Sequence, residues 1–548
     1  MKMEKMPEVT KNENGAFWKN TYEKFEALVY VPKTQLQGDI LNYGFNAPYL
    51  LVFAEKQLSQ EEAVLFARTK GFEKLAADFA SSVVFISPVA DGKVCDWANA
   101  EPDILSEIIS NSRIHQYHKD GVVIANNFFR HSIDGYYIRG AIFRTVLCGY
   151  GRSADYIAEN CLHHFEGDGL WGRSDLAPAA CVLTGLSIAP EVGAEDIPVV
   201  SYGNSQEAEQ LLESRCKHFL KRDAEPDAEG FISDFNTFIK QFRRMNGPLQ
   251  IDPDLEKDGL VIESGIAQVK TSPDNCGDDK GTENHKIGYF AFYNKGLFES
   301  QTAKEKGIPL VLGFHGGGDS CFFFATMAGW AKICHRHNFL LVTIENHLNS
   351  TATEMLELIE ELKKKYRIDK SRIYATGFSM GGCKTWDMIQ EYPQVLAAAA
   401  PMDATFDVGC NVYGNKVEKG INTTVPVPVF YAGGEVTPLP ELPFQEQKCL
   451  DRMAYTLLLN NAELAGRYEE EVKLENKDSW ENKIWGINGN EVETSYDEGR
   501  DATLTMQKFR GTDGRILSVF ASISGQGHDC REHTCEHAWN FMSQFTRE

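Results

Sequence analysis

The sequence lacks an excess of basic residues. Lysine and arginine together number 55, against 78 aspartates and glutamates, which gives a formal net charge of −23 at pH 7. Nucleic acids and anionic membrane surfaces attract proteins that carry clustered positive charge. We therefore expect neither nucleic acid nor membrane among the partners of this chain.

Long apolar runs are also missing. Residues 1–15 are polar and charged, without the apolar core of a signal peptide. No stretch approaches the roughly 18 consecutive apolar residues that a membrane-spanning helix needs. We expect a cytoplasmic protein, and we expect its 13 cysteines to be reduced thiols.

Most of the cysteines lack the sequence spacing that is typical of metal ligands. One segment near the C-terminus is richer, with His528, Cys530, His533, Cys535 and His537. A closed structural zinc site needs two ligand pairs at regular spacing, and this segment offers neither that spacing nor a second pair. We therefore predict no metal and no cofactor, and interpret His528 as a catalytic-loop histidine followed by an ordinary helix.

The most informative stretch that is present is residues 377–382, GFSMGG. It has the form of a nucleophile elbow, the sharp turn between a strand and a helix that exposes an active serine. Small residues must flank such a serine because its backbone is strained and closely packed. Residues 372–375 form a strand-like run before the turn, and residues 380–392 have a helical pattern after it. Ser379 is therefore the predicted nucleophile.

An oxyanion loop is predicted upstream of the elbow. The apolar strand 309–314 leads directly into residues 315–318, HGGG. Backbone N–H groups of Gly316 and Gly317, with that of Met380 after the nucleophile, would donate to the oxyanion of a tetrahedral intermediate. A plain glycine-rich turn is the alternative. The position one strand–helix–strand unit before the elbow favours the oxyanion loop.

The other two members of a catalytic triad follow in the order serine, acid, histidine. His528 lies just after the strand-like run 516–523, where the general base of this architecture is expected. Glu435 follows the buried strand 427–431 and is the predicted acid, since a carboxylate there could hold the tautomer of the histidine. Three other carboxylates remain as alternatives for the acid, namely Glu441, Asp403 and Asp407.

The first half of the chain repeats the pattern of the second without its chemistry. Residues 143–153, FRTVLCGYGRS, are the counterpart of the strand and elbow around Ser379. Each catalytic position has lost its functional group there. A hydrolase needs a nucleophile and a base, so this half is interpreted as catalytically silent. The replacements are Ala54, Glu55 and Lys56 for the oxyanion loop, Gly151 for the serine, Ser205 for the acid and Glu225 for the histidine. An ordinary α/β repetition is the alternative.

The predicted organisation is two tandem units of α/β-hydrolase fold. Residues 1–19 are a polar extension, 20–245 a degenerate and catalytically silent hydrolase-like domain, 246–258 a linker, and 259–548 the catalytic domain. An insertion at about residues 445–503 is either a lid over the active site or an unrelated surface excursion. The roles open to the silent domain are packing on the active unit, shaping the substrate entrance and forming the interface of a homo-oligomer.

Residues 259–548 resemble the esterase family that includes poly(3-hydroxybutyrate) depolymerase-like and feruloyl-esterase-like α/β-hydrolases. The resemblance rests on the HGGG loop, the segment 372–382 with sequence RIYATGFSMGG, and the late His528. It implies a Ser-His-acid triad and carboxylic ester substrates, often aryl or hydroxycinnamoyl esters or hydroxyalkanoate esters. Secreted members usually place an aspartate on a Gly-Thr-x-Asp loop, whereas this chain has Gly-Gly-Glu435.

The function that these motifs predict is hydrolysis of small or aryl esters through an acyl-enzyme on Ser379. An acyltransferase or a serine peptidase with the same triad is the alternative among enzymes. A non-catalytic binding or scaffold protein is the alternative of another class, because the first half indicates that this fold persists here without chemistry.

Overall fold

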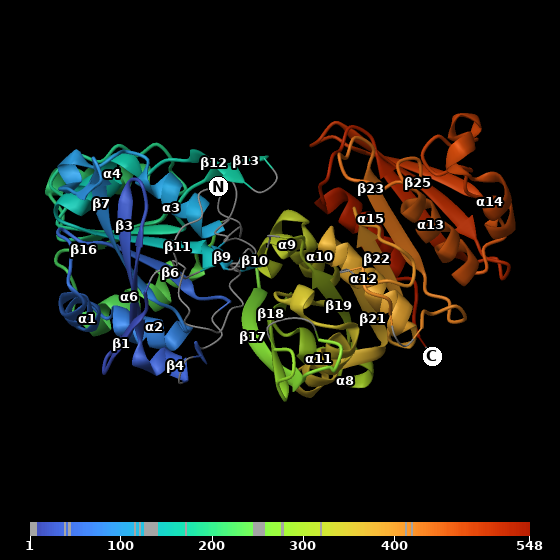
Figure 1. Cartoon of the computed structure of the whole chain (residues 1–548), viewed down its shortest axis with the longest axis horizontal. Coiled ribbons are helices and arrows are strands. Elements are labelled where there is room, and N and C mark those ends of the chain that lie inside the picture. Colours follow the sequence, from blue (N-terminus) through green and yellow to red (C-terminus); the bar gives the residue numbers. More distant parts are fainter. Residues whose placement is uncertain are drawn as a thin grey trace. The chain divides into compact units, whose positions relative to one another are not determined.

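The computed structural model describes residues 8–37, 40–41, 45–113, 117–119, 122–124, 141–169, 172–244, 258–275, 279–317, 320–411, 414–417 and 420–547. The chain divides into two compact units, Met1–Asp252 and Pro253–Glu548, and each contains a central sheet with helices around it (Figure 1). All of the predicted linker except residue 258 lies outside the described residues. In the part of the chain that is described, no helix has the length and apolarity to cross a membrane.

The second unit is built on a ten-stranded mixed sheet. The six strands at its centre run parallel, and antiparallel strands extend it on both sides. Its order is β17 (Leu260–Lys270), β18 (Asn284–Asn294), β20 (Leu340–Ile344), β19 (Ile308–Phe314), β21 (Ile368–Phe378), β22 (Ala398–Met402), β23 (Val429–Gly434), β26 (Ile516–Ile523), β25 (Ala502–Arg510) and β24 (Glu491–Asp497).

Helices cover both faces of this sheet, so the central strands are apolar throughout. All seven residues of β19 are buried, as expected of a parallel strand with a helix layer on each side. One face packs against α11 (Ala352–Lys365), α12 (Met380–Glu391) and α13 (Gln447–Leu459). The other carries α9 (Cys321–Met327), α10 (Trp330–His337) and α15 (Glu532–Met542). The short helices α8 (Gln301–Lys306) and α14 (Ala465–Glu471) complete the unit.

The first unit has a sheet of the same design. Its strand order is β1 (Thr10–Asn12), β2 (Gly15–Thr21), β3 (Phe25–Pro32), β7 (Val83–Ala90), β6 (Pro48–Phe53), β11 (Ala141–Tyr150), β14 (Ala180–Thr184), β15 (Val199–Tyr202) and β16 (Phe219–Arg222), with β8 (Lys93–Val94) beside β7. Its helices are α1 (Gln60–Thr69), α2 (Phe72–Phe79), α3 (Ile104–Arg113), α4 (Arg152–Asn160), α5 (Gln206–Arg215) and α6 (Ala228–Thr237). Three small hairpins pair β4 (Leu36–Gln37) with β5 (Ile40–Leu41), β9 (Tyr117–Lys119) with β10 (Val122–Ile124), and β12 (Phe165–Gly169) with β13 (Gly172–Leu176).

Seven consecutive strands of the two sheets match. The order β3-β7-β6-β11-β14-β15-β16 in the first unit has the same directions and crossovers as β18-β20-β19-β21-β22-β23-β26 in the second. A shared crossover order of this length does not follow from α/β alternation alone, because many orders satisfy the handedness rule. The predicted fold class, two α/β-hydrolase-like units, is confirmed.

The match extends to the turn after β11. Gly151 adopts φ 56° and ψ −119°, while Ser379 at the end of β21 adopts φ 53° and ψ −121°. A Cβ added to Gly151 would lie 1.9 Å from Oε1 of Glu55, so this carboxylate occupies the space of the missing serine side chain. The first unit therefore retains the backbone conformation of the elbow, and the carboxylate of Glu55 lies where a serine side chain would be.

Two boundaries differ from the sequence prediction. Residues 1–19 are not merely a polar extension, because β1 and β2 belong to the sheet and Phe17 and Trp18 are buried in its core. The insertion at 445–503 also contributes to the core of the second unit. Its tryptophans, Trp480 and Trp485, are buried in the main core of the second unit, and Trp485 packs against Phe520. These tryptophans therefore serve the core.

Candidate active site

The turn at Ser379 is a nucleophile elbow in its geometry. Ser379 has a positive φ of 53°, a conformation that costs a non-glycine residue about 1–3 kcal/mol and that concentrates at functional sites. Its glycine neighbours are required sterically. A Cβ on Gly377 would lie 2.2 Å from the carbonyl oxygen of Gly381, and one on Gly382 would lie 2.7 Å from that of Met402. The GFSMGG pattern is therefore imposed by close backbone contacts.

The loop after β19 lies directly against this elbow. A Cβ on Gly381 would lie 2.0 Å from the carbonyl oxygen of Phe314 and 2.7 Å from that of His315. A Cβ on Gly317 would lie 2.6 Å from Sδ of Met380. The structure thus brings together Gly316, Gly317 and Met380, the three predicted oxyanion donors, although their role stays a prediction. Gly318 lies outside the described residues.

A buried imidazole contacts the glycine loop. His315 is 2% exposed, and its Nδ1 and Nε2 face the carbonyl oxygens of Gly316 and Glu345 at 2.7 and 2.5 Å. The carboxylate of Glu345 is buried nearby and accepts the N–H of Cys321 at 2.7 Å. Burial raises the pKa of Glu345, and the charge of His315 opposes that rise.

His528 lies beside the elbow. Its ring packs on that of Phe378, the residue before Ser379, with centroids 4.6 Å apart. Its Nδ1 contacts Oε1 of Glu441, and both side chains are nearly inaccessible to solvent (7% and 2% exposed). An imidazole whose Nδ1 is held by a buried carboxylate presents Nε2 for proton transfer. The carboxylate next to His528 is therefore Glu441, which was one of the alternatives.

The first choice for the acid, Glu435, is directed elsewhere. Its backbone N–H still pairs with Ile523 of β26, and its Oε1 accepts the hydroxyl of Ser522 at 2.8 Å. The chain has not yet left the sheet at this residue, so its side chain remains over β26. The geometry favours Glu441 over Glu435 as the partner of His528, and the assignment to Glu435 needs this correction.

Six residues after Glu435 the chain turns back toward the imidazole. The side chain of Gln445 accepts the N–H groups of Glu441 and Leu442 at 2.9 and 2.8 Å. The hydroxyl of Tyr431, on β23, donates to the carbonyl oxygen of Glu441 at 2.7 Å. These contacts fix the loop that carries the carboxylate.

The remaining acid candidates differ in position. Asp407 is exposed in the loop after β22, where its carbonyl oxygen accepts from Arg452. Asp403, in contrast, is buried at the end of β22, close to Glu441 and His528. Burial, the charge of Glu441 and a hydrogen bond with it raise the pKa of Asp403 well above its usual range. Burial also raises the pKa of Glu441, and the hydrogen bond with Asp403 opposes that rise.

Asp403, Glu441 and His528 form the one group of three potential metal ligands found among the described residues, with ligand atoms within 4.8 Å of one another. Within this group, Glu441 contacts His528, and Asp403 accepts the N–H of Gly434. In the His/Cys-rich segment, the thiols of Cys530 and Cys535 lie 3.5 Å apart and both contact Sδ of Met402, at 3.4 and 3.8 Å, while His533 contacts Ser495 at 2.9 Å.

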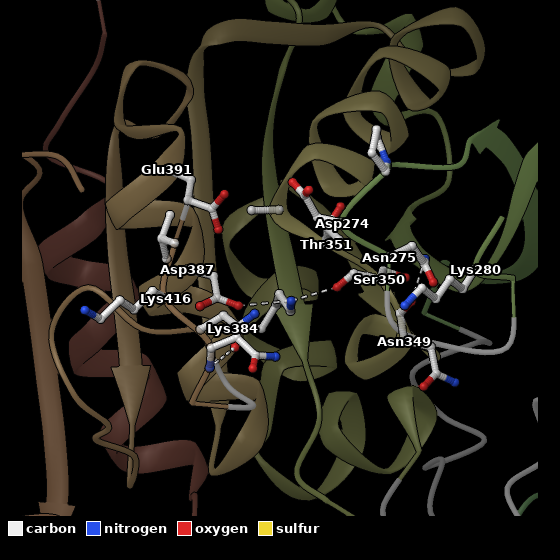
Figure 2. A pocket seen from close by; sticks show the side chains of 15 residues that line it. Asp274, Asn275, Lys280, Asn349, Ser350, Thr351, Lys384, Asp387, Glu391 and Lys416 are labelled. Atoms are coloured by element: carbon white, nitrogen blue, oxygen red, sulfur yellow. Dashed lines mark hydrogen bonds and ion pairs between the residues drawn. The ribbon is translucent and has the colours of Figure 1, made fainter. Parts of the chain in front are cut away.

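A second feature of this unit is a polar cleft of about 390 Å³ beside α11 and α12 (Figure 2). None of the predicted catalytic or oxyanion residues lines it. Figure 2 shows Lys384 between Asp387 and Ser350. Its ammonium donates to the carbonyl oxygen of Ser350 at 2.8 Å and pairs with Asp387 at 3.1 Å, and both charged side chains are buried. This ion pair ties the elbow helix to the loop after β20.

Replacing Asp387 with asparagine is expected to destabilise the second unit by about 3–5 kcal/mol, because it leaves the ammonium of Lys384 buried without a counter-charge. Urea unfolding measures the effect. The exposed Lys416, in the same cleft, provides a control, and its alanine variant should stay within about 0.5 kcal/mol of wild type. A variant with Lys384→Met and Asp387→Leu should recover most of the loss. An unchanged midpoint for Asp387→Asn would contradict this account.

No family model matches the chain. Two curated relatives are ester hydrolases by name. A bifunctional acetylxylan esterase/xylanase of Neocallimastix patriciarum is 21% identical over 248 residues, 43% of this chain and 31% of that protein. Poly(3-hydroxyalkanoate) depolymerase C of Paucimonas lemoignei is 28% identical over 162 residues, 26% of this chain and 36% of that protein. The chain therefore spans about a third of the length of these relatives.

Solved structures similar to this chain include two esterases. The acetyl xylan esterase from Aspergillus awamori has 12% identity and a TM-score of 0.32, over 51% of this chain and 99% of that one. The feruloyl esterase module from Clostridium thermocellum has 12% identity and a TM-score of 0.29, over 52% and 87%. The two curated relatives agree with the resemblance to this esterase family that the motifs indicate.

Proposed function

We propose that this protein is a serine esterase that hydrolyses small or aryl carboxylic esters. The observation that carries the proposal is the arrangement at the elbow: a strained Ser379, with an imidazole beside it whose Nδ1 is held by a buried carboxylate. A purely structural role rarely needs a strained residue, an imidazole and a buried carboxylate together, because backbone strain and buried charge lower the stability of the fold. The ester hydrolases among the relatives support the reaction class.

The mechanism follows from these groups. Ser379 Oγ attacks the ester carbonyl carbon while His528 Nε2 takes its proton, and Glu441 stabilises the imidazolium. N–H groups of Met380 and of the loop at Gly316 and Gly317 bind the oxyanion. Collapse breaks the bond to the alkoxide, which His528 protonates, and an acyl-enzyme remains. Water then attacks this ester with His528 again as base, which releases the acid and restores Ser379.

The names of the two curated relatives indicate a substrate class. One is named for acetylxylan and one for poly(3-hydroxyalkanoate), both of which are oxygen esters of small acyl groups. The net charge of −23 gives no attraction for strongly acidic polymers. Small neutral esters, including aryl esters of the feruloyl type, therefore fit best.

The first unit is proposed to contribute no ester hydrolysis. The turn that corresponds to the elbow carries Gly151, and the carboxylate of Glu55 fills the space above it. Glu225, at the position matched to His528, is ion-paired with Lys70 at 2.6 Å. A carboxylate whose oxygen is engaged by an ammonium group is not placed to take a proton from a nucleophile.

The experiment is to treat the full-length protein with a fluorophosphonate probe, map the labelled peptide by mass spectrometry, and assay p-nitrophenyl esters of increasing acyl length with methyl ferulate. Labelling at Ser379 and turnover of at least one ester are expected. Labelling without turnover would retain the active serine and overturn the substrate class. Absence of both would favour a binding protein, and transfer of the acyl group to added alcohols in preference to water would favour an acyltransferase.

A further inference from the structure

A second buried carboxyl group lies behind the predicted triad. Asp403 follows β22 and is 3% exposed. It adopts a positive φ of 47°, which is uncommon for a residue with a side chain. Two contacts hold it there: its N–H donates to the carbonyl oxygen of Ala432 at 2.8 Å, and its Oδ1 accepts the N–H of Gly434 at 3.0 Å. This carboxyl is therefore fixed by the neighbouring strand β23.

Its position brings three titratable side chains together. Asp403, Glu441 and His528 have polar atoms within 4.8 Å of one another, and Oε2 of Glu441 is buried without a hydrogen-bond partner among the described residues. Two ionised carboxylates can only accept, so Asp403 can offer a hydrogen bond to this oxygen only when it carries a proton. Two buried negative charges at this separation also repel each other strongly. The pair therefore holds one shared proton.

The surroundings indicate which carboxyl keeps the proton. Glu441 also contacts Nδ1 of His528, an N–H donor that favours its ionised form. Asp403 receives the N–H of Gly434, and the other ionisable groups facing it, Tyr431 and Cys530, are uncharged acids at neutral pH that add no positive charge. Burial and the adjacent carboxylate hold the pKa of Asp403 above that of an ordinary aspartate.

We propose that Asp403 is a protonated positioning residue that donates a hydrogen bond to Glu441 and so fixes the carboxylate that orients His528. The catalytic consequence rests on the proposed esterase function, whereas the protonation of Asp403 does not. The arrangement is a relay of Asp403 O–H to Glu441 carboxylate to His528 N–H, in which no proton has to leave Asp403 during turnover.

Asparagine tests this role directly. In Asp403→Asn the amide oxygen can still accept from Gly434, and the amide N–H can replace the acidic O–H as donor to Glu441. We expect kcat/KM at pH 7.5 within about threefold of wild type, while Asp403→Ala should lower kcat by about 10²-fold with little change in KM, as misplacement of a catalytic group does. A loss for Asp403→Asn as large as that for Glu441→Gln would overturn the proposal, because it would make Asp403 the catalytic carboxylate.

A measurement of stability against pH remains valid if the protein hydrolyses no ester. A carboxyl whose pKa is raised in the folded state binds its proton more tightly there than in the unfolded chain. Its contribution to stability is therefore full at acid pH and is lost as pH rises from the unfolded value of about 3.9 through the folded value. Asparagine does not titrate, so it lacks this loss.

The Tm of Asp403→Asn minus that of wild type is accordingly expected to increase steadily between pH 5 and pH 9. Asp407→Asn, at an exposed position in the same loop region, controls for the removal of a carboxylate as such. A difference for Asp403→Asn that is flat or falls with pH would show that Asp403 is ionised in the folded protein and would overturn the proposal, whatever the esterase assays give.

Discussion

Ser379→Ala is expected to lower kcat for ester hydrolysis by about 10⁶-fold, with KM changed little. The hydroxyl is the only group of the elbow that becomes bonded to the substrate, so its removal leaves only binding and the oxyanion donors. The strained turn should persist, because close contacts of Gly377, Gly381 and Gly382 maintain it. Burst and steady-state kinetics with a p-nitrophenyl ester measure the loss.

Ser543→Ala is a suitable control for this variant, since Ser543 caps the C-terminal end of α15 in the same unit. It should retain wild-type turnover. If Ser379→Ala retained more than a few per cent of the activity, the nucleophile would have to be sought elsewhere in the chain. A fluorophosphonate label that disappears with Ser379→Ala and remains with Ser543→Ala would identify the serine independently of any substrate.

Glu441→Gln is expected to lower kcat by about 10⁴-fold, the size of loss that follows when the carboxylate behind a catalytic histidine becomes an amide. An amide at this position can donate to Nδ1 and so select the wrong imidazole tautomer. Glu435→Gln is the matched control, because its hydrogen bond with Ser522 lies over β26 and an amide can maintain it. The kcat values of the two variants, measured by steady-state kinetics, should differ by more than 10³-fold.

The reverse order would restore the assignment that the sequence favoured. Equal losses in both variants would point instead to a general effect of the loop between β23 and α13. Circular dichroism and unfolding midpoints of the two proteins separate that case, because a misplaced loop would lower the stability of both.

The serine and the glycine-rich loop could be predicted because local sterics dictate their residues. Gly377 and Gly381 face backbone atoms at distances no side chain tolerates, so the pattern is visible in the sequence itself. His528 could be predicted from its place after the last parallel strand. Several central strands could also be located, because apolar runs such as β19 mark strands buried on both faces.

The carboxylate that lies next to His528 could not be chosen in this way. Whether Glu435 or Glu441 reaches the imidazole depends on where β23 ends and on the contacts of Gln445 and Tyr431 with the loop. These contacts are tertiary and leave no local pattern. The strand β2 was missed because polar and charged residues precede it. Its buried run of Phe17 and Trp18, which pack in the two clusters on opposite faces of the sheet, is a signal that could have identified it.

The elbow occurs twice in this chain, once with a serine and once with a glycine at the same backbone angles. A serine in that conformation is held at a cost of about 1–3 kcal/mol, which a glycine avoids almost entirely. The first unit, with Gly151, therefore keeps the same turn without the strain that a side chain adds there. A trade-off between activity and stability is expected to limit any attempt to thermostabilise the second unit at Ser379.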